Sequence, residues 1–121
     1  MTMPILVVDD STMSRKLLLK ALPEDWDVSV TQASGGEAAL DVLRQGGVDV
    51  MFLDLTMPGV DGFEVLRRKG EEGLDCITIV VSADIQERAV EQALELGAQA
   101  FVKKPVEADR IRQALEELGL V

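Results

Sequence analysis

The sequence predicts an open, doubly wound α/β fold: a five-stranded parallel sheet with five helices packed on its two faces. Five apolar runs of strand length alternate with helix-periodic segments from one end of the chain to the other. Such strict alternation is typical of parallel sheets whose crossover helices cover both faces. The chain has 121 residues, 47% of them apolar, which suffices for one core, and we expect a single domain over residues 1–121.

The expected strands are short runs rich in β-branched and other apolar residues. They are Ile5–Val8, Val28–Thr31, Val50–Leu53, Ile77–Val81 and Ala100–Val102. Nearly continuous apolar runs indicate strands that are buried on both faces of the sheet. Val28–Thr31 instead alternates apolar with polar residues, so one of its faces meets water and we expect it at an edge of the sheet.

The expected helices follow the strands. The first begins with a cap at Ser11 or Thr12. Its shared apolar face consists of Met13, Leu17, Leu18 and Ala21. The apolar spacing places the other four helices around residues 39–43, 63–66, 85–94 and 111–118. Glycines stop the second, fourth and fifth helices, because glycine readily adopts the left-handed backbone at a helix end. The third is expected to be short, with Glu71 and Glu72 leading away from it.

The composition excludes several classes of function. The net charge of −10 disfavours nucleic acid and anionic membranes as partners, since both are polyanions. Without histidine there is no Ser-His-Asp triad, imidazole base or His-ligated metal in this chain. Cys76 is the single cysteine, which excludes an internal disulfide and favours a reducing compartment. No apolar stretch approaches the roughly 20 residues of a membrane span, so we expect a cytoplasmic protein without membrane insertion.

Three aspartates follow two of the expected strands. Asp9 and Asp10 end the first strand, and Asp54 ends the third. Parallel strands present their carboxyl ends at one edge of the sheet, so the three carboxylates converge there. Any one of them could simply cap a helix, but three close carboxylates repel one another and require a counter-charge. Oxygen ligands without histidine or cysteine indicate Mg²⁺, or alternatively Mn²⁺.

A hydroxyl and an ammonium group are expected at the same edge. Ser82 ends the fourth strand, and the fifth leads into Lys103 and Lys104. Taken singly, a serine at a strand end is a turn residue and a lysine is solvated. Beside the carboxylates they indicate a cradle for the oxygens of a transferred phosphoryl group. Asp54 is then the candidate nucleophile, because carboxylates can form aspartyl-phosphates.

Four segments carry a resemblance to a known family. They are Ile5–Ser11, Leu53–Gly59, Val81–Ala83 and Lys104–Pro105. Over its whole length the chain resembles the response-regulator receiver domains of two-component systems, of the single-domain chemotaxis (CheY-like) kind. The resemblance implies a flavodoxin-like, CheY-like fold with strand order 2-1-3-4-5 and one receiver domain over residues 1–121.

The resemblance also implies roles for the acidic residues. Asp54 would be the phosphoacceptor, taking its phosphoryl group from a phosphohistidine on a sensor histidine kinase or phosphotransfer protein. Asp10 would bind Mg²⁺ directly and Asp9 through water, with Asp54 and the backbone carbonyl of Thr56 as further ligands. The protein would be a signalling switch in a phosphorelay and not an enzyme, assisting only its own phosphorylation and dephosphorylation. Its output would be a target protein or a fused output domain.

The remaining family roles fall on the last two strands. Ser82 would bond a phosphoryl oxygen, and Lys104 would pair with the phosphoryl charge. Lys103 would point the other way along its strand. The resemblance implies a cis Lys104–Pro105 bond and a switch that runs from Ser82 to Phe101, which would reshape the surface of the fourth helix, fifth strand and fifth helix. Phe101 is also read as an ordinary core phenylalanine, and the two readings are compatible.

Asp84 lies two residues beyond Ser82, where a side chain can border the phosphate. We expect this anionic side chain to position a hydrolytic water or to repel the phosphate. Either effect shortens the lifetime of the phosphorylated state.

Three alternative functions use the same fold class or site. A flavodoxin-like electron carrier would use the hydroxyls after the first strand, but Asp9 and Asp10 would repel a flavin phosphate and there is no tyrosine to stack on the ring. An aspartyl-phosphate phosphatase would carry a second aspartate two residues after Asp54, where Thr56 stands. A degenerate receiver that serves as an adaptor would lack site residues that are present here. The sequence leaves open whether the chain acts alone or is the receiver of a longer protein.

Overall fold

The computed structural model describes residues 2–83 and 86–121 and contains every expected strand and helix within those residues. The strands are β1 (Met3–Val8), β2 (Val28–Ala33), β3 (Val50–Leu53), β4 (Ile77–Ser82) and β5 (Ala100–Lys103). The helices are α1 (Thr12–Ala21), α2 (Gly36–Gln45), α3 (Gly62–Glu71), α4 (Glu87–Glu95) and α5 (Ala108–Glu117). Within these residues, none of the helices has the length and apolar character that a membrane crossing requires.

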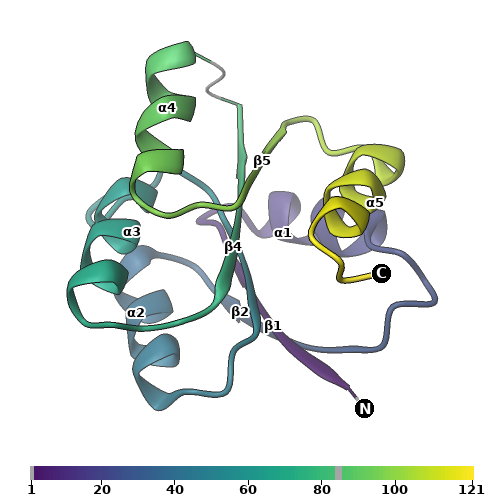
Figure 1. The fold of residues 1–121 in the computed structure, drawn as a ribbon, viewed down its shortest axis with the longest axis horizontal. Coiled ribbons are helices and arrows are strands. Elements are labelled where there is room, and N and C mark those ends of the chain that lie inside the picture. The colour runs from purple at the N-terminus through teal and green to yellow at the C-terminus, as the bar shows by residue number, and fades with distance from the viewer. Residues whose placement is uncertain (1, 84–85) are drawn as a thin grey trace.

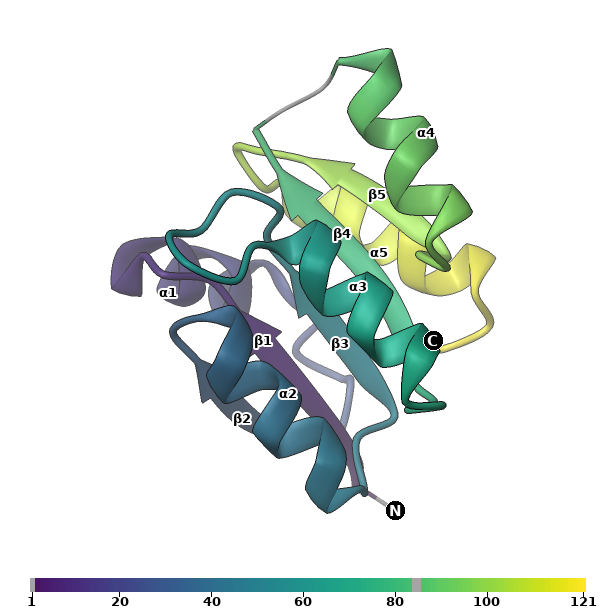
Figure 2. The same cartoon turned by 90° about the vertical axis from the view of Figure 1, so that its left-hand side faces the viewer.

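The strands form one parallel sheet in the order β2-β1-β3-β4-β5, as expected. Helices α2, α3 and α4 cover one face, and α1 and α5 cover the other (Figure 1). A quarter turn brings the α2–α3–α4 layer in front of the sheet (Figure 2). The chain reverses direction of winding after β2, so the carboxyl ends of β1 and β3 lie side by side at the point where ligands bind in such sheets.

Alternation along the central strands divides the core into two layers. Leu6 and Val8 of β1 pack with α2 and α3, whereas Ile5 and Val7 pack with α1 and α5. All four side chains are buried. Strands buried on both faces are therefore what makes the apolar runs continuous in the sequence.

The edge position of Val28–Thr31 is confirmed, although β2 extends further, to Ala33. The expectation of a short third helix is wrong, because α3 continues through Glu71. The added turn carries ion pairs at helical spacing between Arg67 and Glu71 (2.7 Å) and between Arg68 and Glu64 (2.9 Å). The Arg67–Glu71 pair is exposed and the Arg68–Glu64 pair is partly exposed, and surface ion pairs of this kind contribute little to stability. Ile85, expected in the fourth helix, lies outside the described residues.

The first helix begins as expected, with the Ser11 side chain accepting a hydrogen bond from the Ser14 backbone N–H at 3.1 Å. The expected shared apolar face is only half right. Leu18 is 4% exposed, but Leu17 is 49% exposed and Met13 is 64% exposed. At 100° per residue the four apolar positions span about 140° of the helix, and only the half that contains Leu18 and Ala21 faces the sheet.

Adjacent leucines in α1 provide a matched test of this packing. Leu18→Ala is expected to lower the free energy of unfolding by about 2–5 kcal/mol, because it leaves a cavity under the helix. Leu17→Ala removes the same atoms from a half-exposed position and should lower it by less than about 1 kcal/mol. Urea denaturation of both variants measures the difference. Equal losses would contradict the described orientation of α1.

Candidate functional site

The aspartates of the site are positioned by the pairing of β1 with its two neighbours. Val8 pairs with Leu53 of β3 and with Ala33 of β2. The ladder continues one residue further on each side: the Asp9 N–H donates to the Ala33 carbonyl (3.1 Å), and the Asp54 N–H donates to the Val8 carbonyl (3.0 Å). The backbone of Asp54 is therefore held by the strand that carries the other two acids.

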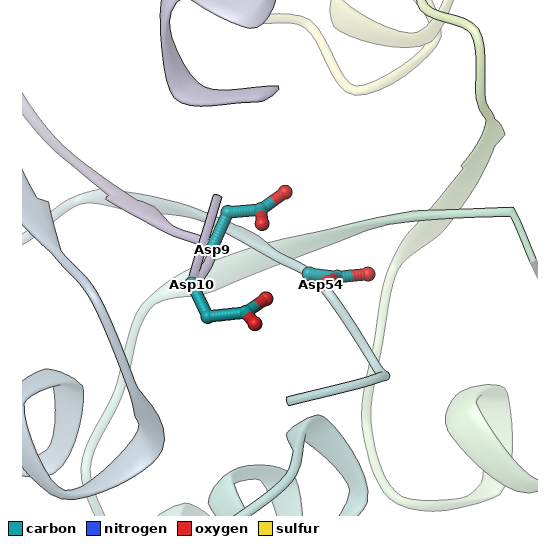
Figure 3. A group of neighbouring side chains, drawn as sticks. All are labelled: Asp9, Asp10 and Asp54. Carbon is teal, nitrogen blue, oxygen red and sulfur yellow. The ribbon is translucent and has the colours of Figure 1, made fainter. Parts of the chain in front are cut away.

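Asp9, Asp10 and Asp54 form one acidic cluster at this edge. One carboxylate oxygen from each lies within 4.8 Å of the others. Figure 3 shows the three carboxyl groups projecting to the same side of the chain. Asp9 and Asp54 are each 6% exposed, whereas Asp10 is exposed. The cluster is thus covered by protein at Asp9 and Asp54 and accessible to solvent at Asp10, and it could hold a metal ion.

Lys104 supplies the positive charge that faces this cluster. Its Nζ lies 2.7 Å from Asp9 Oδ2 and 3.7 Å from Asp54 Oδ1. The backbone N–H of Lys104 donates to the Ser82 carbonyl at 2.9 Å, and the Lys104–Pro105 bond is cis, as expected. Lys103 is exposed and lines a groove with α5 residues instead. The structure thus brings Lys104, and not Lys103, to the acids.

The charge of Asp54 is only partly compensated. Burial raises the pKa of the Asp54 carboxyl above its ordinary value of 3.8, and the charges of Asp9 and Asp10 raise it further. Lys104 and a hydrogen bond from the Thr56 backbone lower this pKa, but their combined effect is the smaller one. Burial is the largest cause of the raised pKa, and the charge of Lys104, which lies closer to Asp9 than to Asp54, does not offset it.

The other expected site residues lie on β4, on β5 and in the loop after β3, apart from one outside the described residues. Ser82 is fully buried at the end of β4, next to β3. Thr56 is exposed in the loop after β3, and its backbone contacts the Asp54 carboxylate through the hydrogen bond described above. Phe101 is partly buried on β5 and packs against the core beneath α2, α3 and α4. Asp84 lies outside the described residues.

Arg15 supports the site in a way that the sequence did not reveal. Its Nη1 donates to the Asp9 backbone carbonyl at 2.6 Å, and its Nε donates to Gln32 Oε1 of β2 at 2.8 Å. The guanidinium therefore ties α1 to the ends of β1 and β2. The available signal was the position of Arg15 in the first turn of a helix that begins at the sheet edge, together with the cap at Ser11.

A cavity of about 330 Å³ adjoins the acidic cluster beneath α1. Its polar lining includes Asp9, Asp54 and Lys104, while Leu18 and Phe52 lie among its apolar lining. Asp10, Thr56 and Ser82 lie outside this lining. The acidic cluster is therefore bordered by an apolar cavity on one side and by solvent near Asp10 on the other.

The raised pKa of Asp54 predicts the pH dependence of stability. A carboxyl whose pKa is higher in the folded than in the unfolded protein destabilises the fold above that folded pKa, and the effect disappears below the unfolded value near 3.8. Without divalent cations, Asp54→Asn should therefore unfold at a higher urea concentration than the wild type at pH 7. The gain should shrink as the pH falls toward 3.8.

Asp75→Asn is the matched control, because Asp75 is exposed and lies before β4 at the opposite edge of the sheet. Asp75→Asn should leave the urea concentration at the midpoint of unfolding almost unchanged at every pH. Destabilisation of the Asp54→Asn protein at pH 7 would show that Asp54 is a stabilising partner of Lys104 and would contradict the balance of charges described above.

Comparisons with known proteins identify the family of this chain. The response regulator receiver domain family matches residues 5–116. Chemotaxis protein CheY of Bacillus subtilis (strain 168) is 30% identical over 113 residues, which cover 93% of this chain and 94% of that protein. A protein-glutamate methylesterase/protein-glutamine glutaminase of Treponema pallidum (strain Nichols) is 38% identical over 104 residues. That match covers 84% of this chain but only 26% of the methylesterase, so the shared part is a fraction of a longer protein.

The fold is also found among solved structures. A chain in the crystal structure of the CheX-CheY-BeF3-Mg²⁺ complex from Borrelia burgdorferi superposes with a TM-score of 0.86 at 28% identity. The match covers 97% of this chain and 89% of that one. The family match, the CheY relative and the shared fold lead to one conclusion: the chain belongs to the response-regulator receiver domain family of two-component signalling proteins, which is a family of signalling modules and not of catalytic enzymes.

Proposed function

We propose that this chain is a phosphorylation-switched response regulator and that Asp54 is its phosphoacceptor. The observation that carries the proposal is the placement of Asp54, a buried carboxylate whose charge is opposed by two neighbouring acids and faced by Lys104. An Asp54 oxygen attacks the phosphorus of a phosphohistidine, the P–N bond breaks, and the imidazole leaves with the electron pair and takes up a proton. Residues 1–121 contain no histidine, so the phosphohistidine donor lies outside this domain.

The acidic cluster fits a hard divalent cation. Its donors are carboxylate oxygens, and within the described residues they come close together without a histidine or cysteine ligand. Asp9, Asp10 and Asp54 would hold Mg²⁺, or alternatively Mn²⁺, with the carbonyl of Thr56 as a further ligand. The cation supplies positive charge that lets an anionic phosphoryl group approach the acids. The presence of Mg²⁺ in the similar CheX–CheY complex supports this choice of metal.

Two further side chains would bind the transferred phosphoryl group. Lys104 lies 3.7 Å from Asp54 and is placed to pair with the charge on the phosphoryl oxygens. Ser82, at the end of the neighbouring strand β4, would donate a hydrogen bond from its hydroxyl. Neither contact requires a new element of structure, since both residues already lie at the carboxyl edge of the sheet.

The partner surfaces follow from the position of the site. Met13 and Leu17 are exposed apolar side chains on α1, the helix that covers the cavity beside Asp54, and we assign them to contact with the sensor kinase or phosphotransfer protein. The output is the face of α4, β5 and α5. Phosphorylation would draw Ser82 toward Asp54 and allow Phe101 to turn inward, which changes that face for a target protein or a fused output domain.

The proposal also covers the extent of the domain and its location in the cell. Residues 1–121 would act as one receiver domain, and the free thiol of Cys76 agrees with a cytoplasmic location. Nothing in this proposal requires nucleic acid or a membrane as a direct partner. The function is signalling by a change of surface, with chemistry limited to the protein's own phosphorylation and dephosphorylation.

Incubation with acetyl phosphate and Mg²⁺, followed by intact mass measurement, tests the acceptor. We expect the wild type to gain the mass of one phosphoryl group and Asp54→Asn to gain none, because the amide cannot act as the nucleophile. Removing Mg²⁺ with a chelator should lower the labelling rate of the wild type at least about tenfold.

Asp75→Asn carries the same loss of charge at the opposite edge of the sheet and should be labelled like the wild type. A phosphoryl adduct that persists in Asp54→Asn would overturn the assignment of the acceptor. Labelling that is unaffected by the chelator would overturn the assignment of the metal.

A further inference from the structure

We propose that Gly62 is a positioning residue for Asp54: its lack of a side chain lets the first turn of α3 abut the acceptor's own backbone and thereby sets where the carboxylate lies. This inference rests on the proposed function, since it concerns the geometry of the residue that would be phosphorylated. The acidic cluster by itself gives no sign of this role, because Gly62 contributes no side chain to the site.

The contact at Gly62 is unusually close. A Cβ atom built on Gly62 would lie 2.4 Å from the Asp54 carbonyl oxygen and 2.7 Å from the Leu55 Cα. Real Cβ atoms essentially never come within 3.0 Å of such atoms. Both obstacles are backbone atoms, so no flexible side chain can move aside. An alanine at this position would therefore displace the Asp54 backbone, or α3, by about 0.6 Å or more.

The surrounding hydrogen bonds direct this displacement toward the acceptor. The Gly62 N–H donates to the Leu55 carbonyl at 3.0 Å, closing the loop that begins at Asp54. Asp61 caps α3 by accepting from the Glu64 N–H at 2.9 Å. On the other side, the Asp54 N–H is bonded to Val8 of β1. Asp54 thus lies between a strand and a helix start, both anchored, and its carbonyl has little room to move without turning the residue.

A displacement of this size matters for the reaction. A reacting group has to be held within roughly 0.5 Å of its productive position, and a misplacement of about 1 Å can lower a rate about 100-fold. The same turn also positions the Thr56 backbone, whose N–H bonds the Asp54 carboxylate. A side chain at position 62 should therefore affect both the acceptor and the cation site that it shares.

Gly36 provides a matched control. A Cβ on Gly36 would lie 2.3 Å from the Val60 carbonyl oxygen, so Gly36→Ala introduces a backbone clash of similar severity at the first turn of a neighbouring helix. The three nearest atoms all belong to Val60, which lies in the same loop but six residues beyond Asp54, whereas the nearest atoms at Gly62 belong to Asp54 and Leu55. Both glycines are buried, so both variants should lose stability. Only the Gly62 variant is expected to disturb the acceptor.

The experiment compares full-length wild type, Gly62→Ala and Gly36→Ala by three measurements. These are the labelling rate with acetyl phosphate at saturating Mg²⁺, the Mg²⁺ dissociation constant by calorimetry, and the ¹³C chemical shift of the Asp54 carboxyl carbon in the metal-free protein. We expect Gly62→Ala to lower the rate at least about tenfold, to weaken Mg²⁺ binding and to move the carboxyl resonance. Gly36→Ala should keep the rate within about twofold and leave the resonance in place.

A folded Gly62→Ala protein with a rate within about twofold of the wild type would overturn the proposal, as would an equal loss in Gly36→Ala. Failure of the wild type to be labelled on Asp54 would instead overturn the proposed function, and the chemical shifts would still decide whether Gly62 positions the carboxylate.

Should Gly62→Ala not fold, Asp61→Ala loosens the same helix start without adding an atom at position 62. Asp61→Ala should then shift the resonance of the Asp54 carboxyl carbon. Asp61→Asn should not shift it, because the amide oxygen still accepts the hydrogen bond from the Glu64 N–H. An unchanged resonance in Asp61→Ala would overturn the proposal.

Discussion

The burial of Asp54 beside two other carboxylates at one edge of the sheet is the constraint on which this site depends. The register of β1 with β3 places Asp9 and Asp54 side by side, and neither acid can leave without breaking the ladder that fixes it. Lys104, delivered from the far side of β4, offsets part of this repulsion, but it lies closer to Asp9 than to Asp54. Burial and the two neighbouring acids together outweigh Lys104, so the negative charge of Asp54 is only partly compensated at the place where a cation and a phosphoryl group would both act.

The rest of the structure holds this charged edge in place. Two apolar layers bury both faces of the central strands, and this packing fixes the positions of the strand ends. Arg15 fixes the β1 end from α1, and the start of α3 fixes the β3 end from the other face of the sheet. Asp54 is thereby supported from both layers of helices, which is the condition for reproducible geometry at a residue proposed to react.

Much of this arrangement could be predicted from the sequence, because strand ends in a parallel sheet lie at one edge. Continuous apolar runs located the strands, and the aspartates that follow them located the acidic cluster. The buried half of α1 could not be predicted, since Leu17 and Leu18 are equally apolar and only contact with the sheet distinguishes them. The closeness of Gly62 to Asp54 was equally hidden, because it depends on how α3 approaches the sheet. The sequence indicated only that a helix starts there.

The most direct test of the central claim is the titration of the Asp54 carboxyl, followed by ¹³C NMR with and without Mg²⁺. In the metal-free protein the midpoint should lie above the ordinary value of 3.8, because burial and the neighbouring acids oppose the charge. Addition of Mg²⁺ should then lower the midpoint, since a bound cation stabilises the carboxylate. A midpoint at or below 3.8 in the metal-free protein, or one that Mg²⁺ does not change, would contradict the account.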